Sequence, residues 1–145
     1  MKKILSILAL FVIAVVPLAY AHPLIEISNP KASTNVGAGL TQITIDFSEA
    51  VDVDFSYIRV FDNNGNQIDN KNTQYLNPED ESILVLTTPP LHDGVYTVTT
   101  QVLSKVDGHL VPYAFVFGVG NVELPPPPQI TVEQQIYFPE AGARF

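Results

Sequence analysis

The chain of 145 residues contains no cysteine and no tryptophan, and its single methionine is Met1. Without cysteine it can form no disulfide and no thiolate metal site, so its fold depends on core packing and hydrogen bonds. Basic residues are also few, with seven Lys and Arg against 15 Asp and Glu and a formal charge of −8. Such an acidic chain offers no basic face to phosphate groups, and we therefore expect no nucleic-acid partner. The length suits one domain.

The first 21 residues have the pattern of an export signal. Lys2 and Lys3 precede an apolar run over residues 4–18, and residues 19–21 form the small-x-small sequence Ala-Tyr-Ala. This run is shorter than the roughly 20 residues that cross a bilayer. We therefore expect cleavage just before His22 rather than an uncleaved membrane anchor. The processed protein is then extracytoplasmic, in the periplasm, at the cell surface or secreted.

The sequence after His22 predicts β-structure, because short runs rich in β-branched residues alternate between apolar and polar positions. Turn signals separate these runs, such as Asn64-Gly65, after which Gln67-Ile68 could begin a returning strand. The predicted strands lie near residues 24–27, 43–47, 57–61, 83–86, 95–102 and 111–119. The spacing predicts an all-β Greek-key sandwich, immunoglobulin-like (cupredoxin-like), of about seven strands over residues 22–120.

Residues 121–145 form a proline-rich linker and a C-terminal tail. The four prolines at 125–128 favour an extended polyproline II spacer. Residues 130–132 are strand-like, and aromatic residues follow them. The tail could be a docked strand, a partner-binding extension or a mobile end, and we favour a loosely attached tail.

The chain has three histidines, and the position of His22 is informative. As the first residue after the expected cut, His22 offers a metal ion both its free α-amine and its ring Nδ1. These two nitrogens close an unstrained six-membered chelate ring, which suits the tetragonal coordination of Cu(II). The alternative is that cleavage falls before a histidine by chance.

A second candidate is Asp107-Gly108-His109, between two predicted strands. Residues two apart in an extended segment can point to the same side, and glycine allows a close backbone approach. The carboxylate and the imidazole could complete a set of three nitrogens and one oxygen with His22. The alternative is a plain hairpin loop, since Asp-Gly is a common turn pair. We interpret the third histidine, His92, as an exposed turn residue.

The order of these elements resembles the CopC family of exported copper-binding proteins. The resemblance covers residues 22–119, nearly all of the expected domain. The residues that carry it are His22, Ile25, Ser28 and Pro30 (H-x-x-L-x-x-S-x-P), 47–51 (F-S-E-P-V), 91–98 (L-x-x-G-x-Y-x-V), 107–111 (D-G-H-x-V) and 115–117 (F-x-F).

The resemblance implies that His22, Asp107 and His109 bind one Cu(II) per chain. It also makes Glu49 a fourth candidate, because the acidic residue of F-S-E lies at or near the metal in some members. The alternative for Glu49 is a surface carboxylate at a strand end. Some members carry a methionine-rich loop for Cu(I), which prefers soft sulfur ligands. Because this chain has neither Cys nor any Met beyond Met1, we expect no Cu(I) site.

The sequence departs from the family pattern in several places near the proposed ligands. Ser104 lies three residues before Asp107, where the family usually has its serine two before, which indicates an inserted residue. Thr100 stands where a tryptophan is common, Leu110 where a proline follows the histidine, and Tyr113 where a glycine is usual. The ligand residues themselves are retained.

The resemblance implies a copper carrier or buffer in copper homeostasis or resistance, not an enzyme, which could hand copper to a membrane copper transporter of the CopD type. One alternative is a metal-free immunoglobulin-like adhesion or assembly module. Another is a histidine-brace copper monooxygenase, because an N-terminal histidine and a second histidine also describe that site. The carboxylate of Asp107 argues against this enzyme, since it would occupy a position that oxygen needs.

Overall fold

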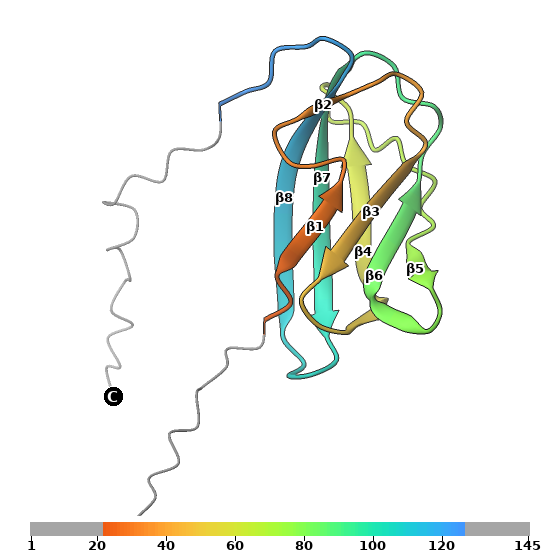
Figure 1. The fold of residues 1–145 in the computed structure, drawn as a ribbon, viewed down its shortest axis with the longest axis vertical. Helices are drawn as coiled ribbons and strands as arrows, with labels where there is room; N and C mark the ends of the chain where they lie inside the picture. The colour runs from red at the N-terminus through yellow and green to blue at the C-terminus, as the bar shows by residue number, and fades with distance from the viewer. Residues whose placement is uncertain (1–21, 127–145) are drawn as a thin grey trace, which may run out of the picture.

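The computed structural model describes residues 22–126, which fold into two packed β-sheets (Figure 1). The expected export signal and the tail after residue 126 lie outside the described residues. The eight strands are β1 (Ile25–Asn29), β2 (Asn35–Val36), β3 (Gln42–Phe47), β4 (Val51–Phe61), β5 (Gln74–Asn77), β6 (Asp80–Thr87), β7 (Gly94–Ser104) and β8 (Leu110–Val119). Residues 22–126 include no helix long and apolar enough to cross a membrane.

The two sheets have the strand orders β1-β3-β6-β5 and β2-β8-β7-β4. Neighbouring strands are antiparallel except for β2, which runs parallel to β8 over two residue pairs. The inward-facing side chains of both sheets form one core. On β3 these are the alternating residues Ile43, Ile45 and Phe47, all fully buried. The predicted all-β sandwich is confirmed.

The structure differs from the sequence prediction in the segment after the Asn64-Gly65 turn. Gln67 forms only an isolated bridge with Phe61, and the next strand, β5, begins at Gln74. The carboxylate of Asp69 explains this, because it accepts hydrogen bonds from the backbone amides of Val60 (2.8 Å) and Lys71 (2.8 Å). These amides are therefore satisfied without a strand partner, and the chain continues as a loop.

One end of the sandwich holds the turns of three connections, β3–β4, β5–β6 and β7–β8, together with the start of the described chain (Figure 1, lower end). We call residues 22–24, 48–50, 78–79 and 105–109 the hairpin end. Both histidine-containing segments singled out in the sequence lie here, although more than 80 residues separate them. The third histidine, His92, precedes β7 at the opposite end, where its carbonyl accepts a hydrogen bond from Tyr96 Oη (2.9 Å).

Candidate metal centre

Two side chains fix the segment that carries His22. Ser48 forms a reciprocal pair with Leu24: its Oγ accepts from the Leu24 amide (2.9 Å), and its own amide donates to the Leu24 carbonyl (2.8 Å). On the other side, Tyr113 Oη donates to the carbonyl of Pro23 (2.7 Å). These bonds tie residues 23–24 to both sheets, because Ser48 follows β3 and Tyr113 belongs to β8. His22 is thereby held next to the β7–β8 loop.

The β7–β8 loop is a tight turn that places Asp107 and His109 side by side. Gly108 has a φ of 74°, a left-handed conformation that glycine adopts without steric cost. Its amide donates to the Ser104 carbonyl (3.1 Å), and the Ser104 amide donates to the His109 carbonyl (2.9 Å). Asp107 Oδ1 accepts from the His109 amide (3.0 Å), an Asx turn that fixes the carboxylate beside the His109 ring.

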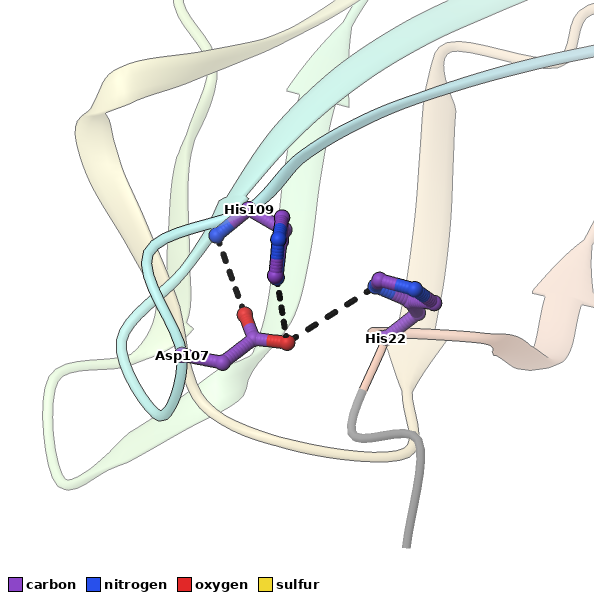
Figure 2. A group of neighbouring side chains, drawn as sticks. All are labelled: His22, Asp107 and His109. Atoms are coloured by element: carbon purple, nitrogen blue, oxygen red, sulfur yellow. Dashed lines mark hydrogen bonds and ion pairs between the residues drawn. The ribbon is translucent and has the colours of Figure 1, made fainter. Parts of the chain in front are cut away.

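His22, Asp107 and His109 form one cluster (Figure 2). Asp107 Oδ2 lies between the two rings, 2.8 Å from His109 Nδ1 and 3.7 Å from His22 Nδ1. The ring centroids are 5.0 Å apart and the planes meet at 78°. One donor atom from each residue lies within 4.8 Å of the others. Metal bonds of about 2 Å hold donors about 3 to 4 Å apart, so small side-chain rotations suffice to close this cluster around an ion.

The cluster is open to solvent and contains a carboxylate that is ionised at neutral pH. The His22 and His109 side chains are 44% and 64% exposed, whereas Asp107 is 23% exposed. The pKa of Asp107 is lowered to about 2, mainly by the hydrogen bond from the His109 amide and next by the His109 side chain. Asp107 is therefore ionised at neutral pH and can act as an anionic oxygen ligand.

The fourth sequence candidate, Glu49, is connected to the loop of the cluster through one other residue, Ser104. Its Oε1 accepts a hydrogen bond from Ser104 Oγ at 2.5 Å. Ser104 is only 2% exposed, and its Oγ also accepts from the amides of Val106 (3.1 Å) and Asp107 (3.2 Å). The structure thus brings together three of the four candidates and connects Glu49 to the loop that carries two of them.

Three residues that support the cluster were not identified as such in the sequence. Ser104 and Tyr113 appear there only as departures from the family pattern, and Ser48 only as part of the F-S-E run. The extra residue between Ser104 and Asp107 leaves the serine hydroxyl within reach of two loop amides. Only the three-dimensional proximity of residues 23 and 113 reveals the role of the tyrosine hydroxyl.

The fold and the cluster define a class: a small β-sandwich protein with a solvent-exposed His–Asp–His cluster at one end. The CopC domain family matches residues 25–120, and the chain belongs to this family. The resemblance noted in the sequence is thereby confirmed.

Two relatives illustrate the range of proteins that contain such a domain. The "Copper transport protein CutJ" of Bacillus subtilis (strain 168) is 28% identical over 117 residues, 81% of this chain but only 21% of CutJ. This chain therefore spans about a fifth of the length of that relative. "Protein YobA" of Escherichia coli (strain K12) is 30% identical over 105 residues, 72% of this chain and 84% of YobA.

Two solved structures have a similar fold. CopC from Methylosinus trichosporium OB3b superposes with a TM-score of 0.64 at 27% identity, covering 71% of this chain and 99% of CopC. PcoC from Escherichia coli, described as a methionine-rich copper resistance protein, gives a TM-score of 0.57 at 25% identity, over 69% and 100% of the two chains. The similarity spans essentially the whole length of both solved chains.

Proposed function

We propose that this protein binds one Cu(II) per chain at the hairpin end, through His22, Asp107 and His109. One observation carries the proposal: the donor atoms of these residues lie within 4.8 Å of one another. Figure 2 shows that they come from the first described residue, His22, and from one hairpin loop. Two imidazoles and a carboxylate are ligands that Cu(II) accepts, and Cu(II) leads the divalent first-row metals in affinity for such sites.

Processing before His22 adds the fourth donor. The new α-amine and the ring Nδ1 of His22 close a six-membered chelate, and His109 and Asp107 complete a set of three nitrogens and one oxygen. A nearly planar arrangement of this set suits Cu(II). The oxidation state follows from the composition, since neither a cysteine nor a methionine remains after processing to offer Cu(I) a soft ligand.

The cellular role that fits such a site is an extracytoplasmic copper carrier or buffer in copper homeostasis or resistance. The printed names of CutJ and PcoC, a copper transport protein and a copper resistance protein, support this role. A membrane copper transporter of the CopD type is the recipient that we propose. We propose no enzymatic activity, because the carboxylate of Asp107 lies between the two rings, where an oxygen-activating site would need an open position.

The test is a Cu(II) titration of the processed chain, beginning at His22, followed by EPR spectroscopy. We expect one equivalent to bind with a tetragonal, nitrogen-rich spectrum. His109→Ala, or one glycine added before His22, should each weaken binding more than about a hundredfold, since each removes a ligand rather than a supporting contact. His92→Ala is the matched control, because this histidine lies at the opposite end, and it should bind like the parent.

Unchanged affinity in both test variants would refute the site. A processed chain that binds no copper would instead favour the metal-free adhesion or assembly module. Oxidative cleavage of a polysaccharide by the copper-loaded chain would favour the monooxygenase.

A further inference from the structure

Three exposed apolar side chains lie in the two segments that carry the cluster at the hairpin end. Leu24 (58% exposed) follows His22 by two residues, and Val106 (64%) and Leu110 (49%) directly flank the Asp107–His109 turn. These are three of the six large apolar side chains that are most exposed in the described residues. Single exposed apolar residues are normal, but a group around a ligand-binding cluster marks an interaction surface. We call Leu24, Val106 and Leu110 the apolar ring.

The charged side chains around the apolar ring are mostly acidic. The loops and strand ends of the hairpin end carry Asp46, Glu49, Asp52, Glu79, Asp80 and Glu81, in addition to Asp107 of the cluster. In the described part of the chain, Lys105 is the one cation at this end, and its Nζ lies 2.6 Å from Glu81 Oε1. An apolar centre within an acidic border is complementary to a surface with an apolar centre and a basic border.

We infer that the apolar ring docks on a partner protein whose contact surface has apolar residues bordered by Lys and Arg, and that copper passes between the two proteins across this contact. The second part rests on the proposed function, whereas the docking itself does not need copper. Because the side chains of His22 and His109 are themselves exposed, a partner ligand can reach the ion without unfolding of the site. Three apolar side chains form a small contact, as suits a transient encounter.

A protein fits this face better than the two other candidate occupants. Anionic lipid headgroups would be repelled by the acidic border. A second copy of this chain would bring two acidic faces together, which is also unfavourable. In CutJ the segment similar to this chain makes up only 21% of the protein, so there the domain is joined to a much larger polypeptide.

The test uses the processed, copper-free chain, labelled with ¹⁵N, and a short peptide with a leucine centre flanked by lysines. We expect amide shifts at residues 24, 48–50 and 105–110, and binding that weakens as salt is added. A peptide with glutamates in place of the lysines should bind at least about tenfold more weakly. Equal binding of both peptides, or shifts spread over the outer faces of the sheets, would overturn the inference.

A matched pair of variants tests the apolar contribution. Leu24→Ser, Val106→Ser and Leu110→Ser together should weaken peptide binding at least about tenfold, as expected for loss of three buried apolar contacts. Ile27→Ser with Leu76→Ser, which alters comparably exposed side chains on β1 and β5, should leave it unchanged. If both variants bind the peptide like the parent, the apolar ring is not the docking site.

Two further measurements separate this inference from its competitors and from the proposed function. Binding to phosphatidylcholine vesicles, or dimerisation of the free chain in sedimentation, would overturn it in favour of a lipid surface or a second copy. The Cu(II) affinity of the triple serine variant should equal that of the parent, because these side chains lie outside the cluster. Docking in a chain that binds no copper would leave the interface in place and refute only the proposed function.

Discussion

The hydroxyl of Ser104 lies 2.5 Å from Oε1 of Glu49 and joins the β3–β4 loop to the β7–β8 loop. The same oxygen accepts hydrogen bonds from the amides of Val106 and Asp107, so one buried side chain sets the position of the turn that carries two proposed copper ligands. Supporting contacts of this kind affect metal affinity without touching the ion.

Replacing Ser104 with alanine should damage both stability and copper binding. The change leaves two loop amides and the Glu49 carboxylate without their partner. Loss of buried hydrogen bonds typically lowers the free energy of unfolding by about 1 to 3 kcal/mol. The loosened turn should weaken Cu(II) binding about 10-fold to 100-fold. Urea unfolding and copper titration measure the two effects, with Ser28→Ala on β1 as the control. A variant with unchanged copper affinity would show that the turn does not depend on this hydroxyl.

The variant Glu49→Gln distinguishes a ligand from a supporting residue. The glutamine oxygen can still accept the hydrogen bond from Ser104, so we expect the EPR spectrum of the copper-loaded chain to match that of the parent. A changed spectrum would mean that Glu49 coordinates the ion. Asp54→Asn, which also removes one charge near the hairpin end, controls for the general electrostatic effect on affinity.

The lowered pKa of Asp107 predicts how its contribution to stability depends on pH. The group titrates near 3.8 when unperturbed and near 2 in the folded chain, because the His109 amide donates to its carboxylate. A lowered folded pKa stabilises the fold above the unfolded value, and this stabilisation is lost as pH falls toward 2. In the copper-free chain, Asp107→Asn should therefore be less stable than the parent at pH 5, with a gap that narrows between pH 4 and 2. Parallel stability curves would contradict the assignment.

The sequence predicts the core well and the supports of the cluster poorly. Alternation of Ile43, Ile45 and Phe47 is a period-two signal that a half-buried strand imposes, and the structure buries all three. The two residues of β2 are too short to show any periodicity. The sequence pattern does not reveal strand β5 either, because three of its four residues are exposed. Local patterns therefore predict the strands with one strongly buried face and miss β2 and β5, which are very short or mostly exposed.

The cluster shows the same limit. The family resemblance predicts that His22, Asp107 and His109 act together, and the structure brings them together. The bond from Tyr113 to the Pro23 carbonyl spans 90 residues, and no local pattern connects the two positions. Contacts between a side chain and a distant backbone carbonyl cannot be predicted from composition or periodicity.

Tyr113→Phe tests whether this distant contact positions His22. The change removes only the hydroxyl that donates to Pro23, so the ring can still pack against the core. We expect weaker Cu(II) binding, by about 10-fold, with a loss of stability of no more than about 1.5 kcal/mol. Tyr57→Phe is the matched control, since its hydroxyl donates to Gln101 on the neighbouring strand β7. If Tyr113→Phe binds copper as tightly as the parent and Tyr57→Phe do, the hydroxyl of Tyr113 is not needed to position residues 22–24.

The position where the family often has a tryptophan offers a prediction about the core. Thr100 is 2% exposed, and its Oγ1 has no hydrogen-bond partner among residues 22–126. A buried hydroxyl without a partner is unfavourable, and valine has nearly the same volume with a methyl group in its place. Thr100→Val should therefore raise the free energy of unfolding by about 1 kcal/mol in urea denaturation and leave copper affinity unchanged. The control is Thr97→Val on the same strand, where the side chain is half-buried and faces outward. A less stable Thr100→Val protein would show that this hydroxyl has a partner, such as a bound water. The stability of the Thr97→Val control should stay close to that of the parent in either case.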